Sequence, residues 1–286
     1  MRSDIKLVII LLSYLIFPLS GWAETPQLTA LLAKNVPYSV TRDVPYCHPA
    51  GLEQKLDVFL PESDGPHPVV IMIHGGGWAG RDKSHKNFQE MADSYAKRGF
   101  AVFNVNYRLS KVAPAPAAVQ DINCAARFIM AHKDQYRVDT NRMMVTGNSA
   151  GCHLGLMLAM CDNELCTGAA SGEWSGQKPE IKLVINRFGI TDAFERAYVG
   201  KGRRSALQWF QGVSGDPKDL AKRMSPVNYA QRKDLAPIFT IHGDADTNTP
   251  VAQGVRLHEA LLAAGNISKL KIIPGGNHGL HNISKE

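Results

Sequence analysis

The chain has 286 residues, of which 44% are hydrophobic and 20% are charged. This length suits one large α/β domain or two small ones, and the composition allows a sizeable core, which excludes disordered and fibrous proteins. The formal net charge of +6 is spread through the chain with no run of five Lys or Arg residues, so nucleic acid is not an expected partner.

The N-terminus has the pattern of a secretory signal peptide. A short, slightly basic start at residues 1–6 leads into an apolar run over residues 7–19, which a proline interrupts. This run is shorter than the roughly 20 residues that a membrane-spanning helix needs. Small residues up to Ala23 fit a cleavage site. We therefore expect a secreted or periplasmic protein with signal peptide 1–23, a single mature domain 24–286, and no stable membrane insertion.

Apolar patterns along the chain predict alternating strands and helices. Leu56, Val58 and Leu60 alternate with polar neighbours, which predicts a half-buried strand in an antiparallel hairpin. Six later apolar runs are too short for helices and suit strands of a parallel sheet: 69–73, 101–105, 143–145, 183–185, 238–241 and 270–273. Helical periods cover 88–95, 119–130 and 255–262. The sequence therefore predicts an α/β protein with one open, mostly parallel sheet and helices on both faces.

Two stretches interrupt this alternation and are expected as insertions over the carboxyl edge of the sheet. They cover about residues 161–180, which are rich in Gly and Ser, and about residues 192–234. The second insertion carries nine basic and five acidic side chains. Such an excess of positive charge would steer anionic glycans towards the protein, although a charged insertion is more often simply a solvated face.

Five cysteines, an odd number, leave at least one thiol unpaired in an oxidising compartment. They lie at positions 47, 124, 152, 161 and 166. Cys161 and Cys166 are the easiest pair, because the chain can turn back at the end of a predicted helix within disulfide reach. Cys124 and Cys152 lie on predicted neighbouring helices, where they either pair or are buried as small core residues.

Residues 143–151 have the pattern of a strand, a sharp turn and a helix around a serine. The apolar run 143–145 leads into Gly147-Asn148-Ser149-Ala150-Gly151. Leucines at positions 154, 156 and 158 indicate that a helix follows. A serine alcohol is a poor nucleophile, so it must stand on a tight turn where a base can reach it. We expect Ser149 to be a catalytic nucleophile; the alternative is a glycine-rich turn in which the serine only caps a helix.

A second glycine-rich loop, His74-Gly75-Gly76-Gly77-Trp78, follows the strand predicted over residues 69–73. The tetrahedral intermediate of acyl transfer needs N–H donors that point at its oxyanion, and glycines let a loop turn its amides outward. The amides of Gly76, Gly77 and Ala150 are the candidates for this oxyanion hole.

No cofactor and no metal are expected. Residues 75–80 also fit the dinucleotide pattern Gly-x-Gly-x-x-Gly, but that pattern needs an acidic residue at the end of the next strand, and residues 104–108 contain none. The chain has no Cys-x-x-Cys pair, and His278-x-x-His281 has no companion ligand pair, so a structural zinc site is not expected.

Two late loops supply a histidine base and a carboxylate to orient it. The run 238–241 leads into His242-Gly-Asp244-Ala-Asp246, and the run 270–273 leads into a loop that contains His278. The order Ser149, Asp246, His278 is that of α/β-hydrolases and of neither chymotrypsin nor subtilisin. Each residue follows a predicted strand, at the edge where open α/β sheets place their sites.

Other residues compete for these roles. Asp244 is an alternative for the acid, and Asp192, which follows the preceding strand, is a weaker one. His281 fits a surface histidine better than the base. Cys152 and His153 are adjacent on one helix, where neighbouring side chains point apart, so we expect them to be packing residues.

Together these motifs resemble α/β-hydrolase carboxylesterases of the hormone-sensitive-lipase and feruloyl-esterase-like kind. The resemblance covers nearly the whole mature chain, in segments 56–61, 74–83, 107–109, 116–121, 147–151, 225–226, 242–246 and 278–279. Trp78 and Lys83 resemble the feruloyl-esterase-like and kynurenine-formamidase-like branch of the family more than the hormone-sensitive lipases. The resemblance implies an α/β-hydrolase fold with a small cap region, and it implies Ser149, Asp246 and His278 as the catalytic triad.

Two positions depart from the family pattern. Relatives usually carry a final helix after the catalytic histidine, whereas eight residues follow His278 here. The corresponding face of the sheet is either covered in another way or meets a partner. Asn148 stands where many relatives have an acidic residue; this should not stop the chemistry, because the position need only tolerate a strained turn.

The sequence predicts a secreted serine carboxylesterase without a cofactor. Its expected substrates are small or glycan-linked esters with short acyl or aryl groups, such as acetyl or feruloyl esters of plant polysaccharides. An arylformamidase fits the glycine–Trp loop, but its metabolite is expected in the cytoplasm. An aminopeptidase would need a large extra domain, and a non-catalytic binding module of this fold would normally have lost Ser, Asp or His. The oligomeric state stays open.

Overall fold

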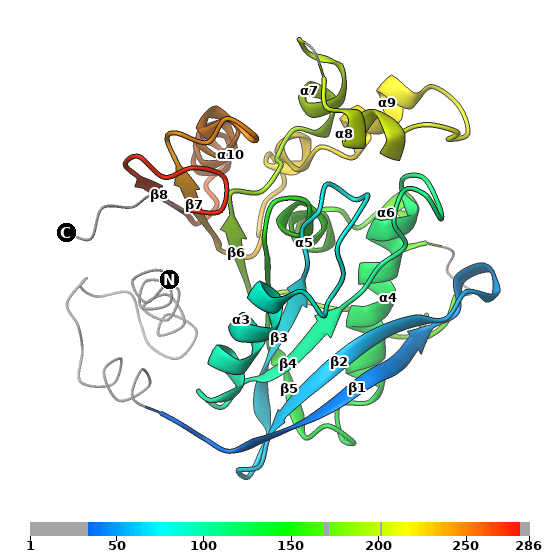
Figure 1. Ribbon diagram of the computed structural model, residues 1–286, viewed down its shortest axis with the longest axis vertical. Coiled ribbons are helices and arrows are strands. Elements are labelled where there is room, and N and C mark those ends of the chain that lie inside the picture. The colour runs from blue at the N-terminus through cyan, green and yellow to red at the C-terminus, as the bar shows by residue number, and fades with distance from the viewer. Residues whose placement is uncertain (1–33, 169–171, 201, 281–286) are drawn as a thin grey trace.

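The computed structural model describes residues 34–168, 172–200 and 202–280 (Figure 1). The signal peptide predicted over residues 1–23 and the histidine at position 281 lie outside these ranges. The centre of the molecule is an eight-stranded sheet with the order β1-β2-β4-β3-β5-β6-β7-β8. Its strands are β1 (Tyr38–Cys47), β2 (Gln54–Pro61), β3 (His67–Ile73), β4 (Ala101–Val105), β5 (Val138–Gly147), β6 (Leu183–Arg187), β7 (Ile238–Gly243) and β8 (Ser268–Ile273).

The strand directions confirm the predicted mostly parallel sheet. β1 and β2 form an antiparallel hairpin, and β2 pairs antiparallel with β4. All the other neighbours are parallel. In the central strand β3, residues 69–73 are fully buried. Burial on both faces is why this segment is continuously apolar rather than alternating.

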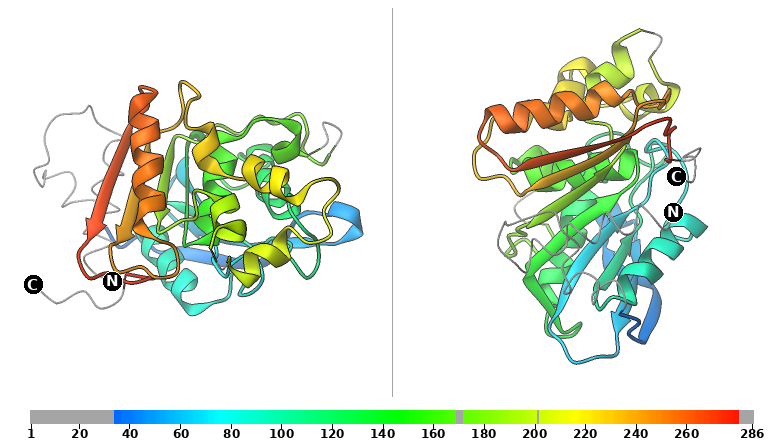
Figure 2. Two further views of the ribbon diagram at one scale, coloured as in Figure 1. Left: turned by 90° about the horizontal axis from the view of Figure 1, so that it is seen from above. Right: turned by 90° about the vertical axis from the view of Figure 1, so that its left-hand side faces the viewer.

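Helices cover both faces of the sheet (Figure 2). α4 (Ala117–Ala131), α5 (Ala150–Met160) and α10 (Val251–Ala263) share a core with Val69 and Ile71, whereas α3 (Lys86–Ala96) shares a second core with Val70 and Met72. This division follows from the period of two in a strand, which sends successive side chains to opposite faces. Within the described ranges, no helix is both long and apolar enough to cross a bilayer.

The predicted second insertion, residues 192–234, forms a cap of short helices. It contains α7 (Ala193–Tyr198), α8 (Arg204–Trp209), α9 (Pro217–Arg223) and the 3-10 turn η3 (Pro226–Tyr229). In Figure 1, α7, α8 and α9 gather at one end of the molecule, beyond α5. The first insertion, residues 161–180, contains α6 (Glu164–Thr167), which packs against α4. A further 3-10 turn, η2 (Pro49–Gly51), joins β1 to β2.

The disulfides confirm the expected Cys161–Cys166 pair and exclude one of the two alternatives left open for Cys124 and Cys152. Cys161 pairs with Cys166, as expected, but Cys124 pairs with Cys47 rather than with Cys152. The end of β1 lies across α4, and this brings together two cysteines that are 77 residues apart in sequence. Cys152 is the free, buried thiol. It lies against β6, where its Sγ accepts a hydrogen bond from the amide of Arg187 at 3.0 Å.

Candidate active site

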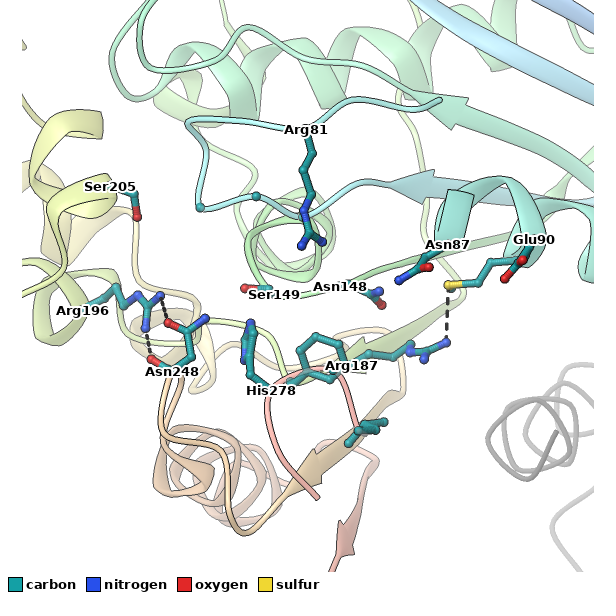
Figure 3. Close-up of a pocket in the computed structure, with 17 residues that line it drawn as sticks. Arg81, Asn87, Glu90, Asn148, Ser149, Arg187, Arg196, Ser205, Asn248 and His278 are labelled. Carbon is teal, nitrogen blue, oxygen red and sulfur yellow. Dashed lines mark hydrogen bonds between the residues drawn. The ribbon is translucent and has the colours of Figure 1, made fainter. Parts of the chain in front are cut away.

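A cavity of about 440 Å³ lies at the carboxyl ends of the parallel strands (Figure 3). Its lining comes from the loops after β3, β5, β6, β7 and β8, together with α3 and the cap. The lining includes Gly76, Gly77, Ser149, Asn248 and His278. Loops that are far apart in sequence meet here because the carboxyl ends of parallel strands share one edge of the sheet.

Ser149 stands on a sharp turn between β5 and α5. Its φ of +55° and ψ of −118° are strained for a residue with a side chain. The turn is held by close backbone packing: a Cβ on Gly151 would lie 2.2 Å from the carbonyl oxygen of Ile73, and one on Gly147 would lie 2.3 Å from the same atom. The amide of Ser149 donates to the carbonyl of Arg187 at 3.1 Å. This geometry presents the hydroxyl to the cavity, as a nucleophile elbow requires.

His278 and Asp246 are joined by a hydrogen bond. His278 Nδ1 lies 2.8 Å from Asp246 Oδ2. An ionised carboxylate can only accept, so Nδ1 carries the proton and Nε2 is left as the basic nitrogen. Figure 3 shows the imidazole beside the side chain of Ser149. The ring also packs edge-on against Phe188, with centroids 4.9 Å apart, which limits its rotation.

Asp246 is buried and strongly favoured as the anion. Burial raises the pKa of its carboxyl, but hydrogen bonds from His242 and His278 outweigh burial and leave the pKa well below the usual range. The amides of Asn248 and Thr249 both donate to Oδ1 at 2.8 Å. The acid is therefore held in the charged form that keeps His278 oriented.

The competing acids lie elsewhere. Asp244 is exposed and accepts from the amide of Gly275 at 2.7 Å. Asp192 caps α7, where its side chain accepts from the amide of Glu195 at 2.7 Å. Neither is hydrogen-bonded to His278, so Asp246 is the one of these three acids that contacts the histidine.

The glycine-rich loop after β3 has unused amides. Gly76 and Gly77 have φ values of +120° and +61°, and a Cβ on Gly76 would lie 2.0 Å from the carbonyl oxygen of Gly80. Among the described residues, the amides of Gly76, Gly77 and Ala150 have no hydrogen-bond acceptor. Gly76 and Gly77 line the cavity, whereas Ala150 is fully buried as the first residue of α5. Three free amides close to a serine hydroxyl can bind a developing oxyanion.

Buried aromatic contacts hold this loop in place. Burial lowers the pKa of His74 to about 4, so its ring is neutral; the ring stacks on Tyr107 with centroids 4.3 Å apart. Trp78 Nε1 donates to His153 Nδ1 at 3.2 Å, and the indole stacks on Trp209 of α8 at 4.4 Å. His153 is therefore a packing residue, as predicted, and it also ties the loop to the serine helix.

Lys83, noted in the sequence without a role, anchors the end of the loop. Its ammonium group lies 2.6 Å from the carboxylate of Asp57 in β2 and 2.7 Å from that of Asp43 in β1. The side chains of Lys83 and Asp57 are 7% and 1% exposed, so this ion pair is nearly buried. The segment that follows the glycines is thereby fixed to the antiparallel edge of the sheet.

Three arginines that were not among the predicted site residues also line the cavity. Arg81 follows the glycine loop, Arg187 ends β6, and Arg196 lies in α7. Arg81 falls in segment 74–83 of the family resemblance and Arg196 in the basic second insertion, but neither signal gave the residue a role, and Arg187 had no signal. Across the described ranges, no three His, Cys, Asp or Glu side chains gather closely enough to hold a metal ion.

The chain is similar to several known esterases. Esterase LipQ of Mycobacterium tuberculosis is 26% identical over 230 residues, which are 79% of this chain and 53% of LipQ. The chain thus spans about half the length of the curated relatives it matches.

Two solved structures are also similar. A truncated carbohydrate esterase from gut microbiota has a TM-score of 0.73 at 25% identity, covering 87% of this chain and 91% of that one. A bifunctional GH43-CE protein of Bacteroides eggerthii has a TM-score of 0.72 at 29% identity, covering 84% and 35%.

The family assignment rests on a match to a family model. The BD-FAE family model matches residues 56–261, well over half of the chain. The matched region includes the glycine loop, the serine turn and Asp246. It confirms the resemblance to α/β-hydrolases of the hormone-sensitive-lipase and feruloyl-esterase-like kind, and the chain therefore belongs to the BD-FAE family.

Proposed function

We propose that the protein is a carboxylic ester hydrolase that works through Ser149, His278 and Asp246. The observation that carries this proposal is the 2.8 Å contact between His278 Nδ1 and Asp246 Oδ2, with the imidazole beside a serine on a strained turn (Figure 3). A neutral imidazole with one nitrogen held by a carboxylate has the other nitrogen free as a base. Membership of the BD-FAE family and the similarity to esterase LipQ support the same activity.

The reaction follows from the positions of these groups. Ser149 Oγ attacks the ester carbonyl carbon while His278 Nε2 takes the hydroxyl proton. The carbonyl oxygen becomes an oxyanion, which the amides of Gly76, Gly77 and Ala150 bind. The bond to the alcohol oxygen then breaks, and His278 returns its proton to that oxygen. Water next attacks the acyl-serine, losing a proton to His278, and the acid leaves as Ser149 recovers its proton.

The proposed substrates are short-acyl or aryl esters, including acetyl or feruloyl groups on plant polysaccharides. A cavity of about 440 Å³ suits a small acyl group together with part of a sugar. A structural neighbour is titled a carbohydrate esterase, which supports a glycan-linked ester here. Export through a signal peptide at residues 1–23 would place the enzyme where such polymers occur, and the two disulfides are compatible with an oxidising compartment.

The arylformamidase alternative rested on the tryptophan after the three glycines. Trp78 is fully buried and stacks on Trp209, and it is absent from the lining of the cavity. It therefore offers no surface to an aryl substrate. An aryl formamide assayed beside the esters tests this alternative directly, and we expect much slower hydrolysis of the formamide.

The test of the proposed function is ester hydrolysis by the mature protein and by Ser149→Ala. We expect release of 4-nitrophenol from the acetate and butyrate esters, with less from the decanoate. The variant should lose on the order of 10⁴-fold or more in kcat, since a serine nucleophile has no substitute in this mechanism. Equal rates for the two proteins would contradict the role of Ser149, and no hydrolysis by either would contradict esterase activity on these substrates.

A further inference from the structure

The charges in the cavity are unbalanced. Three guanidinium groups, those of Arg81, Arg187 and Arg196, line it, and Glu90 is the one carboxylate among the described lining residues. Glu90 pairs with Lys86, its neighbour one turn away on α3, at 3.8 Å. The walls around the nucleophile therefore carry a net positive charge that the protein itself does not neutralise.

The three arginines are not equivalent. Arg196 is buried, and it donates to the main-chain carbonyl and to the side-chain oxygen of Asn248. These bonds use its guanidinium to hold the loop that follows Asp246. Its hydrogen bonds to Asn248 therefore give Arg196 a structural role that needs no ligand.

Arg81 and Arg187 have no such explanation. Within the described ranges, neither guanidinium group lies within ion-pair distance of a carboxylate, and Arg187 Nε is buried without a hydrogen-bond acceptor. Among the described residues, the guanidinium of Arg187 makes one hydrogen bond, from Nη1 to the thioether sulfur of Met91 at 3.5 Å, and a thioether is a weak acceptor. Arg81 is exposed and Arg187 is half-buried, so both guanidinium groups are open to an anionic ligand that the described residues do not supply.

The two arginines lie on the same side of the nucleophile. Figure 3 shows Arg81 reaching down towards Asn148, with Asn87 and Arg187 on that side of Ser149, whereas Arg196 lies on the other side. Arg187 is also fixed relative to the nucleophile, because its carbonyl accepts the amide of Ser149 at 3.1 Å. The neighbouring side chains Asn87 and Asn148 are neutral amides, which can donate to an anion and do not repel it.

We propose that Arg81 and Arg187 bind a carboxylate of the substrate, so that the enzyme prefers esters in which one half of the molecule is anionic. This inference rests on the proposed esterase function and specifies its substrate class. Guanidinium groups recognise carboxylates through paired, charge-assisted hydrogen bonds, and two of them beside the nucleophile would position the ester as well as bind it. The anionic group belongs either to the acyl half, as in a monoester of a dicarboxylic acid, or to the alcohol half, as in an acetylated uronic acid.

Two matched substrate pairs show whether the anionic group belongs to the acyl half or to the alcohol half of the ester. For the acyl half, mono-4-nitrophenyl adipate is compared with 4-nitrophenyl hexanoate, which has the same chain length. For the alcohol half, a mono-O-acetylated methyl glucuronoside is compared with the same acetate of methyl glucoside. We expect a higher kcat/KM for the anionic member of one pair. We also expect this preference to weaken as ionic strength rises, because salt screens partly exposed charges.

The variants Arg81→Gln and Arg187→Gln test the residues themselves. Each should reduce the ratio of kcat/KM for the anionic ester to that for its neutral partner by about 10- to 100-fold, the amount expected when one charge-assisted hydrogen bond is lost. Arg223→Gln on the cap is the matched control: it removes one positive charge from an exposed residue that does not line the cavity, and it should leave both rates unchanged.

The possible outcomes separate this inference from the proposed function. If wild-type enzyme hydrolyses both members of each pair equally well, or if the anionic-to-neutral ratio is the same in wild type and in both variants, the carboxylate site is wrong while the esterase stands. If neither the anionic nor the neutral member of either pair is hydrolysed, the proposed function itself fails. An equal fall of the ratio in Arg223→Gln would mean that net charge, rather than this pair of arginines, selects anionic esters.

Discussion

Asp246 accepts hydrogen bonds on both of its oxygens, and this makes it the residue on which the orientation of His278 depends. One oxygen faces His278 at 2.8 Å, and the other is occupied by the amides of Asn248 and Thr249. Asp246→Asn keeps the shape but presents an amide that can donate to the ring nitrogen. The wrong tautomer of His278 would then be favoured. We expect kcat for 4-nitrophenyl acetate to fall on the order of 10³- to 10⁴-fold.

Asp244→Asn is the matched control for this prediction. Asp244 is two residues away and exposed, and among the described residues its carboxylate accepts a hydrogen bond only from the amide of Gly275. Its replacement should change kcat less than about threefold, as is usual for surface positions. A larger loss in Asp244→Asn than in Asp246→Asn would show that the acid has been assigned to the wrong residue.

The sequence could predict candidate residues where the reaction demands a particular residue type at the end of a strand. It could not predict residues whose role depends only on which side chains surround them in the folded protein. Ser149 and His278 follow predicted strands, and the chemistry of acyl transfer demands a nucleophile and a base at those places. The choice of Asp246 over Asp244 came from the family resemblance, and the hydrogen bond to His278 agrees with it. No motif assigns a role to Arg81 or Arg187, because that role depends on a cavity that five separate loops create.

At the scale of elements, the predicted strands and helices agree with the structure because burial dictates both the apolar pattern and the position in the sheet. The run 101–105 coincides with β4, and the run 69–73 fills β3 except for its first two residues. The Cys47–Cys124 disulfide could not be predicted from such patterns. Contact between β1 and α4 is a tertiary arrangement, and nothing in the local pattern near Cys47 or Cys124 marks it.

The two disulfides close loops of very different length, so their removal should have unequal effects on stability. Cys47 and Cys124 are separated by 77 residues, and Cys161 and Cys166 by five. In the chain-entropy description, a cross-link that closes a longer loop removes more freedom from the unfolded chain. We expect Cys47→Ala/Cys124→Ala to lose about 4 kcal/mol of unfolding free energy and Cys161→Ala/Cys166→Ala about 2 kcal/mol.

Denaturant unfolding of the two double variants, each compared with wild type, measures this difference. Cys152→Ala serves as the control for removing a buried sulfur without removing a cross-link, because Cys152 is the free thiol. A loss in Cys161→Ala/Cys166→Ala equal to that in Cys47→Ala/Cys124→Ala would contradict the dependence on loop length.

At the scale of the whole molecule, buried carboxylates make the fold sensitive to acid. Burial raises the pKa of Asp57 and of Asp246, but hydrogen bonds from Lys83 and Arg42 to the first, and from His242 and His278 to the second, leave both pKa values below their usual range. An acid whose pKa is lower in the folded state than in the unfolded state stabilises the fold fully above its unfolded pKa, about 4. That stabilisation is lost as the pH falls further.

The contribution of Asp246 can be isolated by measuring Tm between pH 7 and pH 3 in wild type and in Asp246→Asn. We expect wild type to be the more stable at pH 7, with a constant difference down to about pH 5. The difference should then shrink as the pH falls through 4, because the variant has no proton to take up at this position. A difference that stays constant to pH 3, or grows, would contradict the depressed pKa.

Trp78 and Trp209 give the molecule a spectroscopic reporter of how its cap sits on its body. Their indole rings are nearly parallel, with 5° between the planes and 4.4 Å between centroids, and one belongs to the glycine loop while the other belongs to α8. Two stacked indoles shield one another from water, so their fluorescence reports on this contact. A red shift of the emission while the far-ultraviolet circular dichroism stays unchanged would mark separation of α8 from the glycine loop while the sheet beneath remains folded.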